Sequence, residues 1–120
     1  ADLDPVFDFY TPVIIANNAF LAEEPETARA FLDAVSRGYE FAIEHPREAG
    51  EILCKAAPEL DPDLVKASQE YLADKYQADA PQWGYIDQER WDAYYAWLNE
   101  KGLTETPIEA GTGCSNEYLP

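Results

Sequence analysis

The chain has 120 residues, of which 47% are hydrophobic and 13% aromatic, and its 24 acidic residues outnumber 8 basic ones to give a net charge of −16. This composition supports one folded domain and excludes a disordered chain. The negative charge repels phosphate backbones and anionic lipids, so we expect no nucleic-acid partner. The acidic surplus is more simply explained as a soluble surface than as a dedicated binding face.

Residues 9–18 form the segment that we predict to be extended. Val13, Ile14 and Ile15 are consecutive β-branched residues, which suit a buried strand, and an Asn-Asn pair closes the run. The rest of the chain is patterned for helices, so a strand here would leave its backbone groups without ladder partners. Because the chain also contains no methionine, we expect it to be a piece of a larger protein that supplies the missing sheet.

Helices are predicted after this segment. A short turn at 18–23 is followed by helices over about 25–44 and 62–76, by one that opens at Pro46, and by one between an Asp87 cap and a Gly102 stop. Pro25, Pro46 and Pro62 each stand at a helix start, where proline presets φ and lacks an N–H that would be unpaired in any case.

Apolar residues recur at helical spacing along these segments and predict buried faces. We expect Phe31, Leu64 and Tyr71 to lie in the core. The last helix has an aromatic face, for which core packing is the default and stacking on a flat ligand is the alternative. Gly38 costs about 1 kcal/mol relative to alanine inside a helix, and we expect it to permit close packing of a neighbour.

Catalytic chemistry has little support in the sequence. His45, the single histidine, precedes a proline at a helix start and is better explained as a junction residue. Cys114 lies in a Gly-Thr-Gly-Cys-Ser run, but no second histidine exists to activate it. Cys54 fits a buried structural thiol, and a disulfide between the two cysteines stays open. We therefore expect no catalytic residue, no metal site, no cofactor and no enzymatic activity.

Two places could bind a ligand. Asp8, Phe9, Tyr10 and Thr11 combine a carboxylate, two rings and a hydroxyl, which suits a planar hydrogen-bonding molecule. A simple alternation of the two rings between core and surface explains the same residues equally well. Trp83 stands in a loop, beside a glycine, and is the other candidate.

Several stretches of the chain resemble one family. Residues 9–17 and 25–43 carry most of the resemblance, and further matching stretches are 46–53, 64–72, 80–84, 90–91, 97–98 and 116–119. Together they resemble the C-terminal segment of ABC-importer substrate-binding proteins of the NMT1/thiamine-precursor class. Within that class, the group that binds hydroxymethylpyrimidine-type thiamine precursors is the most similar.

The resemblance implies a fold that is mainly α with one N-terminal strand in this segment, as part of an α/β type II periplasmic-binding fold. It implies a hinge-crossing extended segment and strand at 1–17, a helical part of one lobe at 18–102 and an irregular tail at 103–120. The parent would be extracytoplasmic, either periplasmic or anchored as a lipoprotein. It would capture a pyrimidine for an ABC permease, with the ligand held between two lobes.

By position in that fold, the ligand-binding residues would be Asp8, Tyr10 and Thr11, with Trp83 from the loop, and the N-terminal half of the parent would complete the site. A related fungal enzyme group makes the pyrimidine with a cysteine-rich motif, a histidine and a cofactor lysine, which have no visible counterpart here. An enzyme lobe and a self-standing helical interaction module remain as alternatives. An isolated segment could pair its strand in a swapped homo-oligomer.

Overall fold

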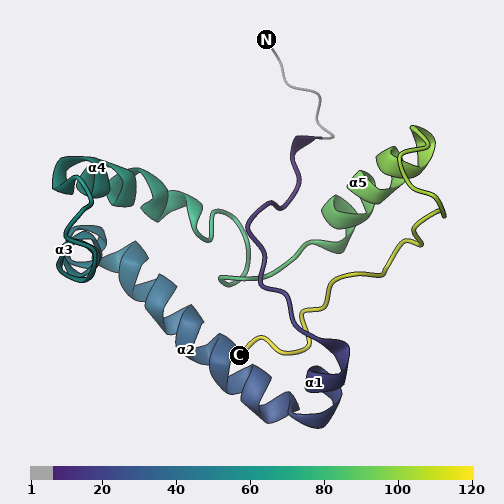
Figure 1. The fold of residues 1–120 in the computed structure, drawn as a ribbon, viewed down its shortest axis with the longest axis horizontal. Coiled ribbons are helices and arrows are strands. Elements are labelled where there is room, and N and C mark those ends of the chain that lie inside the picture. Colours follow the sequence, from purple (N-terminus) through teal and green to yellow (C-terminus); the bar gives the residue numbers. More distant parts are fainter. Residues whose placement is uncertain (1–6) are drawn as a thin grey trace. The chain divides into compact units, whose positions relative to one another are not determined.

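The computed structural model describes residues 7–120, and the helices in that part of the chain follow the predicted order (Figure 1). They are α1 (Asn18–Glu23), α2 (Pro25–Glu44), α3 (Pro46–Ala56), α4 (Pro62–Leu72), the short 3₁₀ helix η2 (Ala73–Lys75) and α5 (Gln88–Glu100). The predicted helices are thereby confirmed, with one difference. The helix predicted over about 62–76 ends as an α-helix at Leu72 and continues only as η2.

Proline and aspartate residues mark the starts of the helices. Proline occupies the first turn of α2, α3 and α4. The carboxylate of Asp61 accepts hydrogen bonds from the N–H groups of Asp63 (2.9 Å) and Leu64 (3.3 Å), and Asp87 caps α5 in the same way. These caps satisfy N–H groups that have no partner inside the helix.

The predicted N-terminal strand is wrong. No strand occurs among residues 7–120, and Val13, Ile14 and Ile15 are exposed, with Ile15 retaining 87% of its accessible surface. A β-strand needs a neighbouring strand to pair its N–H and C=O groups, and the described residues offer none. The predicted α/β periplasmic-binding fold is therefore not found among residues 7–120, where helices are joined by irregular segments. A strand-swapped dimer loses its basis as well.

Contacts divide the chain into two compact units, which we describe separately. The α5 unit contains the described residues up to Glu23 together with Ile86–Glu117, and the α2–α4 unit contains Glu24–Tyr85 with Tyr118–Pro120. The predicted boundaries at residues 17 and 102 stay a prediction, and residues 1–6 of the predicted extended segment lie outside the described residues.

Small side chains form the core of the α2–α4 unit. The buried residues in its helices are Ala28, Ser36, Gly50, Val65 and Ala73. A Cβ at Gly50 would lie 3.4 Å from Cγ1 of Val65, so the glycine lets α3 and α4 pack closely. The guanidinium of Arg47 adds an ion pair to Glu70 across the same two helices, at 2.6 Å.

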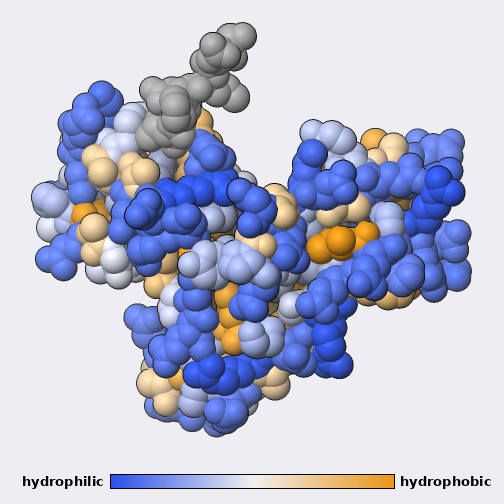
Figure 2. Space-filling model, turned by 180° about the vertical axis from the view of Figure 1, so that it is seen from behind, coloured by the Kyte–Doolittle hydropathy of each residue, from blue (hydrophilic) through white to orange (hydrophobic). Residues whose placement is uncertain are grey.

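Larger apolar side chains stay outside this core. Phe31, Leu64 and Tyr71 are exposed, Leu64 at 68% and Tyr71 at 67%, so their predicted burial is wrong. Orange apolar side chains are accordingly visible at the molecular surface (Figure 2). A Cβ at Gly38 would meet nothing within 4 Å, and the expected close neighbour is absent from the described residues. None of the helices between residues 7 and 120 has the length and apolar character needed to cross a membrane.

Asparagine side chains hold the irregular tail of the α5 unit. The amide of Asn99 donates to the carbonyl of Ile108 (2.8 Å), and its oxygen accepts from the Ile108 N–H (2.9 Å). Asn116 makes the same pair of bonds to the backbone of Ile86, at 2.8 and 2.9 Å. These bonds replace the backbone pairing that the tail lacks.

Candidate functional site

An aromatic hollow of about 150 Å³ lies in the α5 unit, lined by Phe9, Tyr10, Trp91, Tyr94 and Tyr95. The ring of Phe9 stacks on Tyr94 with centroids 4.3 Å apart, and Tyr10 stacks less closely on Trp91, at 6.5 Å. The three α5 residues are spaced by three and four positions, which places them on one helical face. The spacing that predicted core packing therefore builds the wall of a half-buried hollow.

Tyr10 is held in this wall from two sides. Its hydroxyl oxygen accepts a hydrogen bond from the Asp87 N–H at 3.0 Å, and the guanidinium of Arg90 lies over its ring, 4.3 Å from the centroid. Arg90 is itself fixed by Asp8, whose carboxylate accepts at 2.6 Å and whose carbonyl accepts at 2.9 Å. The structure thus brings the predicted residues Asp8 and Tyr10 together through an arginine.

Sequence reasoning did not select Arg90 as a site residue. It stands 82 positions from Asp8, so no local pattern connects the two. The available signal was its inclusion, next to Trp91, among the stretches that carry the family resemblance. Its planar guanidinium presents donors in a fixed fork that reaches a carboxylate and a carbonyl together, whereas a lysine ammonium has no such fixed geometry.

The other two predicted site residues do not join this hollow. Thr11 is exposed, and its hydroxyl makes no hydrogen bond within the described part of the chain. Trp83 belongs to the α2–α4 unit, where its ring stacks on Tyr39 at 4.3 Å.

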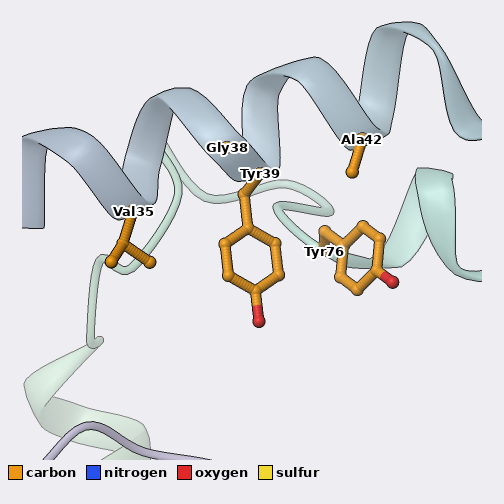
Figure 3. A pocket seen from close by; sticks show the side chains of 5 residues that line it. All are labelled: Val35, Gly38, Tyr39, Ala42 and Tyr76. Carbon is orange, nitrogen blue, oxygen red and sulfur yellow. The ribbon is translucent and has the colours of Figure 1, made fainter. Parts of the chain in front are cut away.

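A second hollow, of about 360 Å³, lies on α2 and is lined by Val35, Gly38, Tyr39, Ala42 and Tyr76. Figure 3 shows the Tyr39 side chain leaving α2 toward the same side as those of Val35 and Ala42, with the ring of Tyr76 beside it. The rings of Tyr39 and Tyr76 meet edge to face, 5.1 Å apart. This hollow has no charged residue in its lining, so it offers apolar surface more than specific recognition.

Both cysteines are free. Burial raises the pKa of the Cys114 thiol, the Asp92 carboxylate raises it further, and a hydrogen bond with Gln88 partly offsets the two. His45 is exposed, 3.9 Å from the carboxylate of Glu44. Within residues 7–120, no cluster of three His, Cys, Asp or Glu side chains could hold a metal ion.

Comparison with known proteins confirms the resemblance to NMT1-like substrate-binding proteins. Residues 1–49 match the family model described as NMT1/THI5 like. A formylaminopyrimidine-binding protein of Halalkalibacterium halodurans is 30% identical over 82% of this chain and 31% of its own length.

Two further relatives widen the range of activities. The riboflavin-binding protein RibY of Chloroflexus aurantiacus is 25% identical over 96% of this chain and 34% of its own length. A 4-amino-5-hydroxymethyl-2-methylpyrimidine phosphate synthase of Candida albicans is 38% identical over 92% of this chain and 31% of its own length. The chain thus spans about a third of the length of the curated relatives that it matches.

Proposed function

We propose, with the NMT1/THI5-like resemblance as the premise, that this chain is part of a solute-binding protein for a planar nitrogen heterocycle of the pyrimidine type. The observation that carries the proposal is the aromatic hollow of the α5 unit, with Asp8 and Arg90 beside it. Two of the relatives are named as binding proteins, for formylaminopyrimidine and for riboflavin. Both ligands contain flat nitrogen-bearing rings.

The chemistry of the hollow suits such a ring. Aromatic side chains offer stacking faces and a large apolar contact area, while the few polar groups around a pocket fix the orientation of a ligand. Tyr10 and Asp8 supply polar groups of this kind. Thr11 and Trp83, which do not line the hollow, stay proposed contributors to ligand binding in the full-length parent. Since Arg90 already engages Asp8 and the Tyr10 ring, the site is partly preorganised.

The rest of a longer protein would complete this arrangement. Exposed apolar residues such as Ile15, Leu64 and Tyr71 would be buried against the part of the parent that the chain does not cover. In our proposal, the parent works outside the cytoplasm, captures a pyrimidine thiamine precursor by closing around it, and delivers it to an ABC permease.

Isothermal titration of the full-length parent tests this proposal. We expect 4-amino-5-hydroxymethyl-2-methylpyrimidine or its formylamino analogue to bind, with a negative heat-capacity change from burial of the ring. A Tyr10→Ala variant should bind more weakly because it loses one wall of the hollow, whereas Glu105→Ala, at an exposed charged position outside the hollow, should bind as the wild type does. Absence of binding to either pyrimidine would refute the ligand assignment.

A second candidate function is a segment of a pyrimidine-synthesising enzyme. The identity of 38% to the Candida albicans synthase favours it. Its catalytic groups would have to come from residues other than Cys114, because the raised pKa of that thiol keeps it protonated near neutral pH. The full-length protein should then form the pyrimidine product when it is supplied with its co-substrates, and a protein that binds the pyrimidine without forming it would exclude this function.

A further inference from the structure

The indole N–H of Trp91 is a buried donor without an acceptor. Its nitrogen has less than 1 Å² of accessible surface, and no group among residues 7–120 accepts a hydrogen bond from it. Folded proteins satisfy the large majority of buried polar groups, and an unsatisfied one is unfavourable by about 1–3 kcal/mol. The same indole lines the aromatic hollow of the α5 unit. An unpaired donor at a candidate ligand site therefore needs an explanation.

A glycine of the tail lies against this donor. A Cβ at Gly113 would lie 3.3 Å from the indole nitrogen and would collide with the hydroxyl of Tyr95. Gly113 and Gly111 both have positive φ angles, 83° and 76°, which other residues adopt with difficulty. The tail thus reaches the Trp91 N–H only because position 113 carries no side chain.

Few bonds hold this part of the tail in place. The Gly111 N–H donates to the Asp92 carboxylate, at 2.9 and 3.1 Å from its two oxygens, and the Thr112 hydroxyl donates to the Glu109 carbonyl at 2.6 Å. Glu109, Gly111, Thr112 and Gly113 are exposed. Cys114, which is half-buried, adds only a weak thiol hydrogen bond to the Gln88 side chain, at 3.5 Å. A segment that is held by exposed or weak hydrogen bonds opens at small energetic expense.

We propose that the Trp91 N–H is a specificity-determining donor for a ring nitrogen or carbonyl of the ligand, and that residues 109–114 cover it until the ligand binds. This inference rests on the proposed function and adds the atom that recognises the heterocycle. When residues 109–114 move away, the Trp91 N–H, which had no acceptor, donates a hydrogen bond to the ligand. The ligand then gains both the bond and the relief of the unfavourable burial.

The size of the hollow narrows the class of ligand. A cavity of about 150 Å³ is known to take up benzene, so a hollow of this volume suits a single six-membered ring. The three fused rings of riboflavin would extend beyond a hollow of this volume. We therefore assign the site to a monocyclic heteroaromatic ligand with an acceptor in the plane of its ring.

The test compares two ligands of the same shape in the full-length protein. One is 4-amino-5-hydroxymethyl-2-methylpyrimidine, and the other is the corresponding benzene, which lacks the ring nitrogens. In Trp91→Phe, the affinity for the pyrimidine should fall about three- to tenfold, the range expected for one hydrogen bond. The affinity for the benzene should change much less, because the N–H contributes nothing to its binding.

Trp97→Phe is the matched control. Trp97 lies on α5 and stacks on Tyr94, but it does not line the hollow, so it should preserve the preference for the pyrimidine. The benzene titration also detects misfolding, because a damaged hollow would lose affinity for both ligands equally. An unchanged pyrimidine-to-benzene ratio in Trp91→Phe overturns the inference, and so does tighter binding of riboflavin than of the pyrimidine. A wild type that binds no pyrimidine refutes the proposed function instead.

Discussion

Tyr10 illustrates how much of a site a single residue can organise. Its ring lies under the Arg90 guanidinium, and its hydroxyl accepts from the N–H of Asp87, the residue that caps α5. Sequence reasoning found Asp8 and Tyr10 because a carboxylate and a phenol in one short segment are visible locally. It could not find Arg90 or Asp87, since their contacts with the segment span 82 and 77 positions.

The bond between Tyr10 and Asp87 gives a direct prediction. Tyr10→Phe removes the acceptor of the Asp87 N–H and should lower the free energy of unfolding by about 0.5–1.5 kcal/mol, as measured by urea denaturation. Tyr71→Phe is the control, because the Tyr71 side chain is exposed and its change should stay within about 0.5 kcal/mol. Equal effects of the two substitutions would show that the bond does not stabilise the α5 unit.

Cys114 gives a prediction about reactivity. Burial raises the pKa of its thiol, so at pH 8 a smaller fraction is thiolate than in free cysteine, and the thiolate is the reactive form. In a Cys54→Ala background, a disulfide reagent such as Ellman's should react more slowly with Cys114 than with free cysteine. The rate should still rise with pH beyond the range in which the rate for free cysteine levels off. A rate equal to that of free cysteine would contradict the assigned shift.

The helices of this chain were predicted correctly from local signals, whereas the predicted strand was wrong. A proline in the first turn or an aspartate cap such as Asp61 acts within its own helix, so its signal is local. Val13, Ile14 and Ile15 have strand-forming side chains, but a strand forms only with a partner, and the described residues contain none. Periodicity likewise identified the apolar side of α4, without indicating whether anything covers Leu64 or Tyr71.

Gly38 provides a prediction at the scale of α2. Its φ is not positive and a Cβ there would meet nothing within 4 Å, so Gly38→Ala should raise the free energy of unfolding of this chain by about 1 kcal/mol through helix propensity. Gly113→Ala is the opposite case, because position 113 has a φ of 83° and no room for a Cβ. Gly113→Ala should therefore lower the free energy of unfolding. Thermal or urea unfolding of both variants checks the two signs.

The whole molecule combines a small core with a large apolar exterior. The buried hydrophobic residues of the described chain are Ala28, Val65 and Ala73, whereas many larger ones are exposed. Exposed apolar side chains gathered in this way mark surfaces that other chain segments or partners cover. Relatives about three times as long as this chain fit the proposal that a parent protein provides the cover.

A comparison of two contexts tests that proposal. In this chain, Leu64→Ser should change the free energy of unfolding by no more than about 0.5 kcal/mol, since the Leu64 side chain is 68% exposed. In the full-length parent, the same substitution should be unfavourable by about 2 kcal/mol, because a buried leucine would be replaced by a polar group. Val65→Ala serves as the control, since Val65 is already buried here and its loss should destabilise both proteins by about 1–2 kcal/mol. If Leu64→Ser has the same small effect in both contexts while Val65→Ala destabilises both, the exposed side of α4 is not covered by the rest of the parent.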